Sequence, residues 1–272
     1  MSIDRGWVVA GASSRGPSHE EDGTPCQDAF QRRASGSTAI VCVCDGVGSA
    51  PKSETGAQTV TAAVIQHIAK ALDGGPVNGL EARTALLRAA CAAGRDALLA
   101  RAADLTADPD DLACTTIVVV AWDEEVHVAQ IGDGAVVVRS SGGLQVLSAP
   151  DNSEYANETY ALSSSSWEDH LRSSRAADVS AFAAFTDGCQ RASLVAAGRP
   201  TPFVAFWDPV FEFVQSATGA AADDDEIRSL LDGARMRATS RDDKTLVVAV
   251  RREAACAQPA ETPPPRMIES LP

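Results

Sequence analysis

The chain has 272 residues and 45% of them are hydrophobic, which is enough for one sizeable globular domain or two small ones. Its formal net charge of −14 argues against nucleic acid as a partner, because a polyanion repels a chain of the same sign. No stretch approaches the ~20 apolar residues that a membrane-spanning helix needs, so we also expect no membrane partner.

The cysteines indicate a reducing compartment. There are seven, an odd number, and no two of them form a C-x-x-C pair. This pattern argues against a zinc ribbon and against a disulfide framework. Because residues 1–5 also lack the apolar core of a signal peptide, we expect a cytoplasmic protein with reduced thiols.

The first half of the chain is predicted to contain two strands and then two long helices. Strands are predicted from continuous apolar runs, and helices from apolar residues that recur at three- and four-residue steps. In chain order we expect a strand at 7–13, a loop at 14–27, a strand at 39–44, a helix from Glu54 to a stop at Gly74, and a helix at 80–105. The two successive helices should pack as an antiparallel pair.

Strands dominate the second half. Apolar runs predict them at 115–122, 126–131, 135–139, 144–147, 181–185 and 245–250. Residues 153–174 are polar and patternless, which predicts a long surface loop, and weak helical signals cover 209–216 and 225–234. The order of elements lacks regular βαβ alternation, so the predicted fold class is an α+β sandwich.

An aspartate stands at or near the end of an apolar strand at four places, and Asp28 is a candidate for a fifth. The four are Asp45, Asp133, Asp187 and Asp242. A carboxylate beside a buried strand is costly unless its charge is compensated, and Mg²⁺ and Mn²⁺ prefer oxygen ligands of this kind. Asp-Gly is also a common turn dipeptide, so the pattern alone leaves both a metal site and ordinary turns open.

Five segments, taken in order, resemble the motifs of type 2C protein phosphatases. They are Gln27-Asp28, Val41–Gly48 with its Asp-Gly-x-Gly, Thr115-Thr116 followed by Gly132-Asp133, Phe185–Gly188, and Ser240–Thr245 before the last strand. Each motif is weak by itself, but the ordered set is specific and extends over about residues 6 to 252.

The resemblance implies a fold and a metal centre. Two antiparallel β-sheets should pack face to face with helices on the outside, and Mn²⁺ or Mg²⁺ should bind at one end as a pair of ions, with a weaker third. By carry-over Asp45 bridges the pair and the Gly46 carbonyl binds one ion, while the remaining roles fall to other aspartates. Asp187 and Asp242 complete the coordination of the other ion of the pair. Asp28 acts through a bound water, and Asp133 holds the third ion together with Asp187.

The same resemblance implies an activity. The chain should be a serine/threonine protein phosphatase that hydrolyses phosphoserine and phosphothreonine by direct attack of a metal-bridging hydroxide, with Asp45, Asp187 and Asp242 as its catalytic residues. It implies phosphoprotein substrates, and a serine/threonine kinase acting on the same targets as a functional partner. We expect the phosphatase domain to cover residues 1–252, and the Pro-rich composition predicts a disordered tail at 253–272.

Three departures from the family pattern leave other functions open. The family's phosphate-gripping Arg is missing before Gln27-Asp28, where Arg15 or Lys52 would have to substitute. Gln27 itself replaces Glu, and Asp243 replaces Asn. The alternatives are a catalytically weak or inactive phosphatase-fold module that binds or regulates, and a phosphatase that acts on small molecules.

Overall fold

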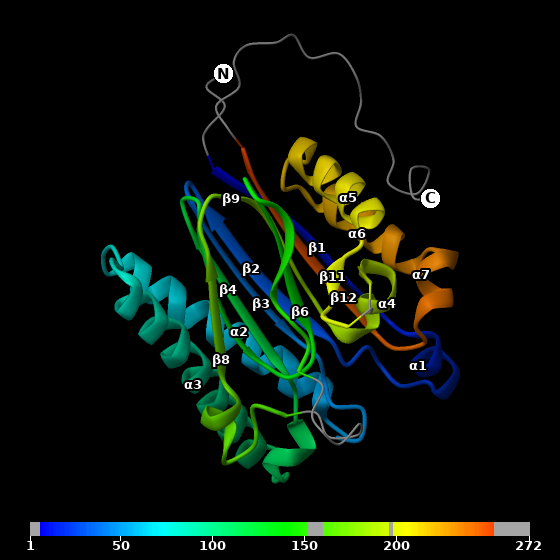
Figure 1. Cartoon of the computed structure of the whole chain (residues 1–272). Helices are drawn as coiled ribbons and strands as arrows, with labels where there is room; N and C mark the ends of the chain where they lie inside the picture. The colour runs from blue at the N-terminus through cyan, green and yellow to red at the C-terminus, as the bar shows by residue number, and fades with distance from the viewer. Residues whose placement is uncertain (1–5, 152–159, 196–197, 253–272) are drawn as a thin grey trace.

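The computed structural model describes residues 6–151, 160–195 and 198–252. Its centre is a pair of five-stranded antiparallel sheets, which lie face to face in Figure 1. The first sheet contains, in spatial order, β1 (Gly6–Ser14), β12 (Lys244–Arg252), β9 (Val179–Phe185), β6 (Ala135–Ser140) and β7 (Gly143–Ser148). The second contains β2 (Ala29–Ser35), β3 (Thr38–Cys44), β4 (Thr116–Trp122), β5 (Glu125–Ile131) and β8 (Arg172–Ala176).

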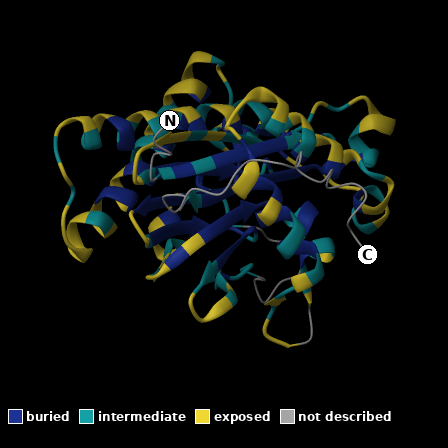
Figure 2. Ribbon diagram, turned by 90° about the horizontal axis from the view of Figure 1, so that it is seen from above, coloured by how far each residue is buried: buried dark blue, intermediate teal, exposed yellow. Residues whose placement is uncertain are grey.

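Helices cover the outer faces of both sheets. The helices α2 (Ser53–Asp73) and α3 (Leu80–Asp104) pack on the second sheet, and α5 (Val204–Ser216) and α6 (Ala221–Asp232) pack on the first. The remaining described elements are short: α1 (Pro17–Asp22), η1 (Pro109–Leu112), η2 (Trp167–His170), η3 (Asp187–Cys189), α4 (Gln190–Ser193), α7 (Ala234–Thr239) and the hairpin of β10 (Leu194–Val195) with β11 (Thr201–Pro202). Figure 2 shows buried residues on the inner strands and exposed ones on the outer helices.

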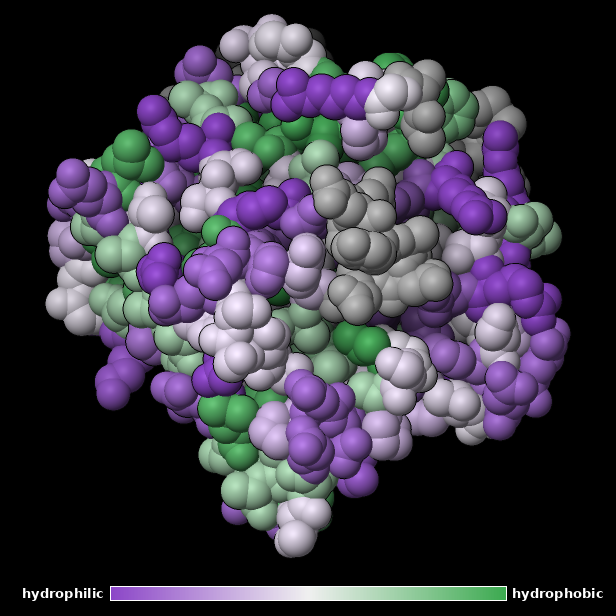
Figure 3. Space-filling model, turned by 60° about the horizontal axis from the view of Figure 1, so that its bottom comes forward, coloured by the Kyte–Doolittle hydropathy of each residue, from purple (hydrophilic) through white to green (hydrophobic). Residues whose placement is uncertain are grey.

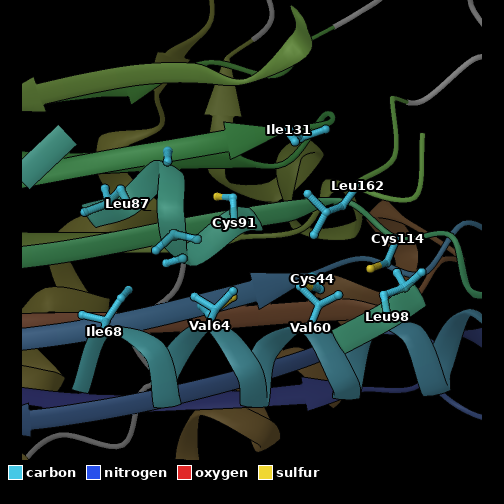
Figure 4. Packing of buried hydrophobic residues seen from close by; sticks show 14 of the residues in the cluster. Cys44, Val60, Val64, Ile68, Leu87, Cys91, Leu98, Cys114, Ile131 and Leu162 are labelled. Atoms are coloured by element: carbon cyan, nitrogen blue, oxygen red, sulfur yellow. The ribbon is translucent and has the colours of Figure 1, made fainter. Parts of the chain in front are cut away.

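The side-chain alternation along the strands explains this layering. On β3, Val41 and Val43 point into the layer between the sheets, whereas Cys42 and Cys44 point toward α2 and α3. Because both faces of the inner strands are covered, their sequences are apolar at almost every position. In Figure 4 the outer layer is seen from close by, with Val60, Val64 and Ile68 of α2 packed beside Leu87 and Cys91 of α3.

The predicted fold class is therefore confirmed. The long helices, the inner strands and the α+β sandwich all agree with the expectation from sequence. The six cysteines among the described residues are free thiols, as expected. Within the described ranges, no helix combines the length and apolar character that a bilayer span requires.

Several elements were not predicted. Helix α1 lies inside the predicted loop at 14–27, and β2 was missed entirely. Part of the predicted loop at 153–174 lies outside the described residues, and its described remainder contains η2 and the start of β8, so a structureless loop was wrong there. Both β2 and β8 are edge strands with largely polar sequences, so neither has an apolar run to reveal it. The predicted tail also lies outside the described residues.

Candidate active site

The strand registers bring the predicted aspartates to one end of the sandwich. In the second sheet Ala29, directly after Asp28, pairs with Cys44, directly before Asp45. In the first sheet Phe185 pairs with both Leu246 and Ala135, so the end of β9 lies beside the starts of β12 and β6. The segments that carry Asp133, Asp187 and Asp242 therefore meet there as well. This end lies toward the bottom of Figure 1. In Figure 3 the bottom of the molecule is turned toward the viewer, and its coloured surface is mostly hydrophilic or intermediate, with small hydrophobic patches.

A hydrogen bond between Asp28 and Thr186 connects the two sheets at this end. The Thr186 hydroxyl donates to Asp28 Oδ2 at 2.8 Å and accepts from the backbone N–H of Thr245 at 2.9 Å. Thr186 follows β9 and Thr245 lies in β12, so both belong to the first sheet. They fix the carboxylate of Asp28, which directly precedes β2 of the second sheet. Only Thr or Ser at position 186 could supply a short hydroxyl in this place.

Asp45 is held in place through its backbone, so its carboxylate is not needed to fix its position. Its N–H donates to Thr115 Oγ1 at 3.0 Å, and its carbonyl accepts from the Thr115 N–H at 2.8 Å. The next residue, Gly46, must be glycine, since a Cβ there would lie 2.7 Å from the Gln27 carbonyl oxygen. Thr115 is thus a positioning residue for the first predicted metal ligand.

Neighbouring aspartates help to raise the pKa values of Asp45 and Asp187. Burial raises the pKa of Asp45 well above its usual value, and the charges of Asp28, Asp187, Asp133 and Asp242 add to the rise. Burial also raises the pKa of Asp187 to about 6, assisted by Asp242 and Asp133 and opposed by a hydrogen bond with Asp45. The five carboxylates therefore form one electrostatic cluster, called the carboxylate cluster below.

Two buried oxygens of the carboxylate cluster have no hydrogen-bond donor among the described residues. They are Asp28 Oδ1 and Asp187 Oδ1. Burial is the main cause that raises the pKa of Asp28; the Asp243 charge adds to it and the Thr186 hydroxyl opposes it. Buried acceptors without donors, in a cluster of like charges, are what a hard divalent cation would satisfy.

The residues thus fit the metal centre that the resemblance implies, although they do not form a closed ligand shell by themselves. Among the described residues, no three His, Cys, Asp or Glu side chains form a group that could hold a metal ion as they stand. Backbone carbonyls and waters would have to supply further ligands, which is usual for Mg²⁺ because it keeps several waters.

Asp242 and Asp243 are neighbours with different environments. Asp242 is exposed, and its carboxylate accepts only the N–H of Asp243, at 2.9 Å, among the described contacts. Asp243 is 3% exposed and accepts the N–H groups of Gly16 and Gln27, both at 2.6 Å. Its Oδ2 also lies 2.9 Å from Nδ1 of His19. Asp243 therefore ties the α1 segment and Gln27 to the start of β12.

The role of Asp243 was not predicted from the sequence. The sequence did carry a sign of it, because Asp243 is an acid at a position where the family pattern has Asn. The two carboxylate oxygens accept one N–H each, from Gly16 and Gln27, whereas an amide would have a single acceptor oxygen for both. The backbone of Asp243 also lies against Gly188, where only glycine fits, because a Cβ there would lie 1.9 Å from the Asp243 carbonyl oxygen.

The structure places the two phosphate-gripping candidates at the border of the site. Arg15 is partly buried, and its Nη2 donates to the His19 carbonyl at 2.9 Å. Lys52 is exposed at the start of α2. In the described part of the chain, neither side chain has a hydrogen bond or ion pair with the carboxylate cluster.

An α-β-β-α sandwich with aspartates gathered at one end of its sheets defines a class of metal-dependent phosphatases. Comparison with known proteins agrees: residues 15–242 match the model of a family described as protein phosphatase 2C. Since this match covers more than half of the chain, the chain belongs to the protein phosphatase 2C family, and it is a serine/threonine protein phosphatase.

Relatives extend over nearly the whole chain. It is 31% identical over 260 residues to serine/threonine-protein phosphatase 3 of Escherichia coli (strain K12), covering 91% of this chain and 99% of that protein. Two solved structures show the same fold: the serine/threonine phosphatase PstP/Ppp of Mycobacterium tuberculosis (TM-score 0.58, 17% identity, 91% and 100% of the two chains) and PppA of Pseudomonas aeruginosa, a regulatory component of T6SS (TM-score 0.60, 15% identity, 90% and 98%).

Proposed function

We propose that the carboxylate cluster is the catalytic centre at which this chain hydrolyses phosphoserine and phosphothreonine in proteins. One observation carries the proposal: five aspartates beside strands of both sheets come together, their charges help to raise the pKa values of Asp45 and Asp187, and two buried carboxylate oxygens lack donors among the described residues. A protein would not keep such a cluster for stability, because uncompensated buried charge is destabilising. Asp45, Asp187 and Asp242 are the proposed catalytic residues.

The proposed metal ligands are Asp28, Asp45, the Gly46 carbonyl, Asp133, Asp187 and Asp242, for two Mn²⁺ or Mg²⁺ ions and a weaker third. When bound, such ions lower the pKa of a coordinated water, which supplies a hydroxide nucleophile near neutral pH, and they neutralise phosphoryl charge. The direct attack of a metal-bridging hydroxide expected from the family rests on this arrangement, and no side chain is assigned as a nucleophile.

The chain's own residues then position the reactants. Thr186 orients Asp28, and Thr115 orients Asp45, each through hydrogen bonds that leave a carboxylate oxygen available. The tie between Asp243 and the α1 segment holds Gln27 and its neighbour Asp28 against the first sheet. Arg15 and Lys52 remain the proposed groups for the substrate phosphate, since both border the cluster and carry positive charge.

The proposal also covers the organisation of the chain. Residues 1–252 form one catalytic domain, in line with the continuous sandwich from β1 to β12, and residues 253–272 form an appendage that catalysis does not need. Phosphoproteins are the substrates, and a serine/threonine kinase that acts on the same targets is the functional partner.

The proposal is tested by steady-state hydrolysis of p-nitrophenyl phosphate and of phosphoserine, phosphothreonine and phosphotyrosine peptides. We expect turnover of the first two peptide classes with Mn²⁺ or Mg²⁺, its loss in EDTA and its return when metal is added back. Activity that survives EDTA, or a preference for sugar phosphates over all peptides, would contradict the proposal.

A further inference from the structure

An apolar pocket of about 610 Å³ lies on the outer side of the first sheet, between α4, the β10–β11 hairpin, α5, α6 and α7. Its large apolar lining residues come from β10, α5 and its N-cap, α6 and α7: Leu194, Val195, Phe203, Phe206, Leu230 and Met236. A volume of this size is within the usual range of ligand pockets and holds more than one large side chain.

Exposed apolar residues concentrate at this pocket. The described residues include four large apolar side chains that are exposed, and two of them, Val195 at 44% and Phe203 at 37%, line the pocket. A third, Val204 at 53%, is the neighbour of Phe203 in the chain, while Leu80 lies elsewhere, on α3. Exposed apolar side chains that gather in this way mark a binding surface rather than ordinary scatter.

The charge at the pocket is opposite to that of the molecule. Arg191 and Arg235 belong to its lining, both are exposed, and neither has a hydrogen bond or ion pair with any described residue. No described Asp or Glu lines the pocket, although the chain has 37 acidic and 23 basic residues. The pocket therefore suits an apolar group with negative charges beside it.

Two residues that line the pocket are close in the chain to aspartates of the carboxylate cluster. Arg191 follows Asp187 by four residues, and Thr239, also in the lining, precedes Asp242 by three. At ~3.3–3.6 Å per residue, these chain lengths place the walls within about 11–14 Å of the two aspartates. Between the two regions the Gln190 side chain donates to the Asp133 carbonyl at 2.5 Å.

We infer that this pocket is a specificity subsite that receives a large apolar side chain of the phosphoprotein substrate, while acidic neighbours of that side chain meet Arg191 and Arg235. The inference rests on the proposed function of the carboxylate cluster. An extended peptide advances ~3.3 Å per residue, so the apolar residue should stand about three to five positions from the phosphorylated one. The two arginines would also offset the repulsion between a phosphorylated, acidic segment and this acidic protein.

The test compares phosphothreonine peptides that differ only in Leu or Ala at three to five positions on either side of the phosphorylated residue. With the wild type, the Leu peptide should have a kcat/KM about 10- to 100-fold above the Ala peptide, as expected for an apolar group in a matching pocket. In Phe203→Ser and in the double variant Arg191→Glu/Arg235→Glu this preference should shrink to within a few-fold. Hydrolysis of p-nitrophenyl phosphate, which is too small to reach the pocket, should not change.

Matched controls are available on α3, where Leu80 is an exposed apolar residue and Arg101 an exposed arginine without a described partner. The variants Leu80→Ser and Arg101→Glu should keep the full preference for the Leu peptide. Equal kcat/KM values for the Leu and Ala peptides in the wild type would overturn the inference, and so would an unchanged preference in both pocket variants.

A second measurement separates this inference from the proposed function. Fluorescence anisotropy of the dye-labelled Leu peptide reports binding even if no hydrolysis occurs, and binding that Phe203→Ser weakens about tenfold supports the subsite. Absence of all turnover would count against the function alone. Sedimentation that shows a wild-type dimer lost in Phe203→Ser would assign the pocket to a second copy of the chain and overturn the inference.

Discussion

Two buried acids at the end of this sandwich, Asp243 and Asp28, are satisfied in opposite ways. Asp243 is 3% exposed and accepts the backbone N–H groups of Gly16 and Gln27, with His19 Nδ1 2.9 Å from its Oδ2. Asp28 is 6% exposed, yet one of its oxygens has no donor among the described residues, and it faces other carboxylates. A buried acid that has its donors joins segments of the fold, whereas one without donors needs a cation.

The largest effect is expected from Asp45→Ala. Asp45 is the proposed bridging ligand, so its loss should lower kcat/KM with Mn²⁺ at least about 1000-fold, or about 4 kcal/mol of transition-state stabilisation. The fold should persist, and the melting temperature without metal should stay level or rise because a repulsive charge is gone. Steady-state assays and thermal melts measure the two effects, and near-wild-type Mn²⁺-dependent turnover would contradict the assignment.

Asp243→Ala should show the opposite pattern, with stability affected first. Removing the carboxylate leaves the buried N–H groups of Gly16 and Gln27 without an acceptor, so we expect a loss of about 2–4 kcal/mol in the free energy of unfolding. Asp243→Asn keeps one acceptor oxygen and should lose less. Denaturant unfolding compares the two variants; equal stability of wild type and Asp243→Ala would show that this tie is dispensable.

The cluster should also make the metal-free protein sensitive to pH. Burial and neighbouring charges raise the folded-state pKa of Asp187 from 3.8 to about 6, so its protonated form is favoured in the folded state. The stabilisation that this protonated carboxyl provides is therefore fully present below the unfolded pKa and is lost as pH rises through about 6, by about 3 kcal/mol for this residue. Thermal melts between pH 4 and 8 in EDTA should show this loss.

Mn²⁺ should abolish the pH effect, because a bound cation favours the ionised carboxylates. Asp45→Ala removes one member of the cluster and should flatten the profile in EDTA. A metal-free profile that rises between pH 4 and 6.5 would mean that the carboxylates do not repel one another.

The smallest effect is expected from truncation after Arg252. The removed residues are rich in proline and poor in apolar periodicity, so neither the melting temperature nor the turnover of p-nitrophenyl phosphate should change. A fall of more than a few degrees in melting temperature would show that the tail contributes to the domain.

The inner parts of the molecule were predictable because their sequences are periodic or continuously apolar. This was true of β3, of α2 and α3, and of the aspartates that follow inner strands. Edge strands β2 and β8 were not predictable, because exposure on an edge removes the apolar signal. Helix α1 is six residues long with none of them buried, so it has no periodic pattern to detect.

The contacts between distant segments were also beyond the sequence. The bonds of Asp243 to Gly16 and Gln27 join residues 227 and 216 positions apart, and only the paired registers of β1, β12 and β9 bring them together. The apolar pocket likewise draws its lining from α4, the β10–β11 hairpin, α5, α6 and α7, and only the fold brings these segments together.

The central claim, that the carboxylate cluster is a metal centre, is tested most directly by isothermal titration calorimetry of Mn²⁺ into metal-free protein near pH 7. We predict saturable binding of at least two ions to the wild type and the loss of that binding in Asp45→Ala, with Asp123→Ala, an exposed aspartate in the β4–β5 turn, as the matched control. Equal binding by the wild type and Asp45→Ala, or no binding by the wild type, would contradict the account.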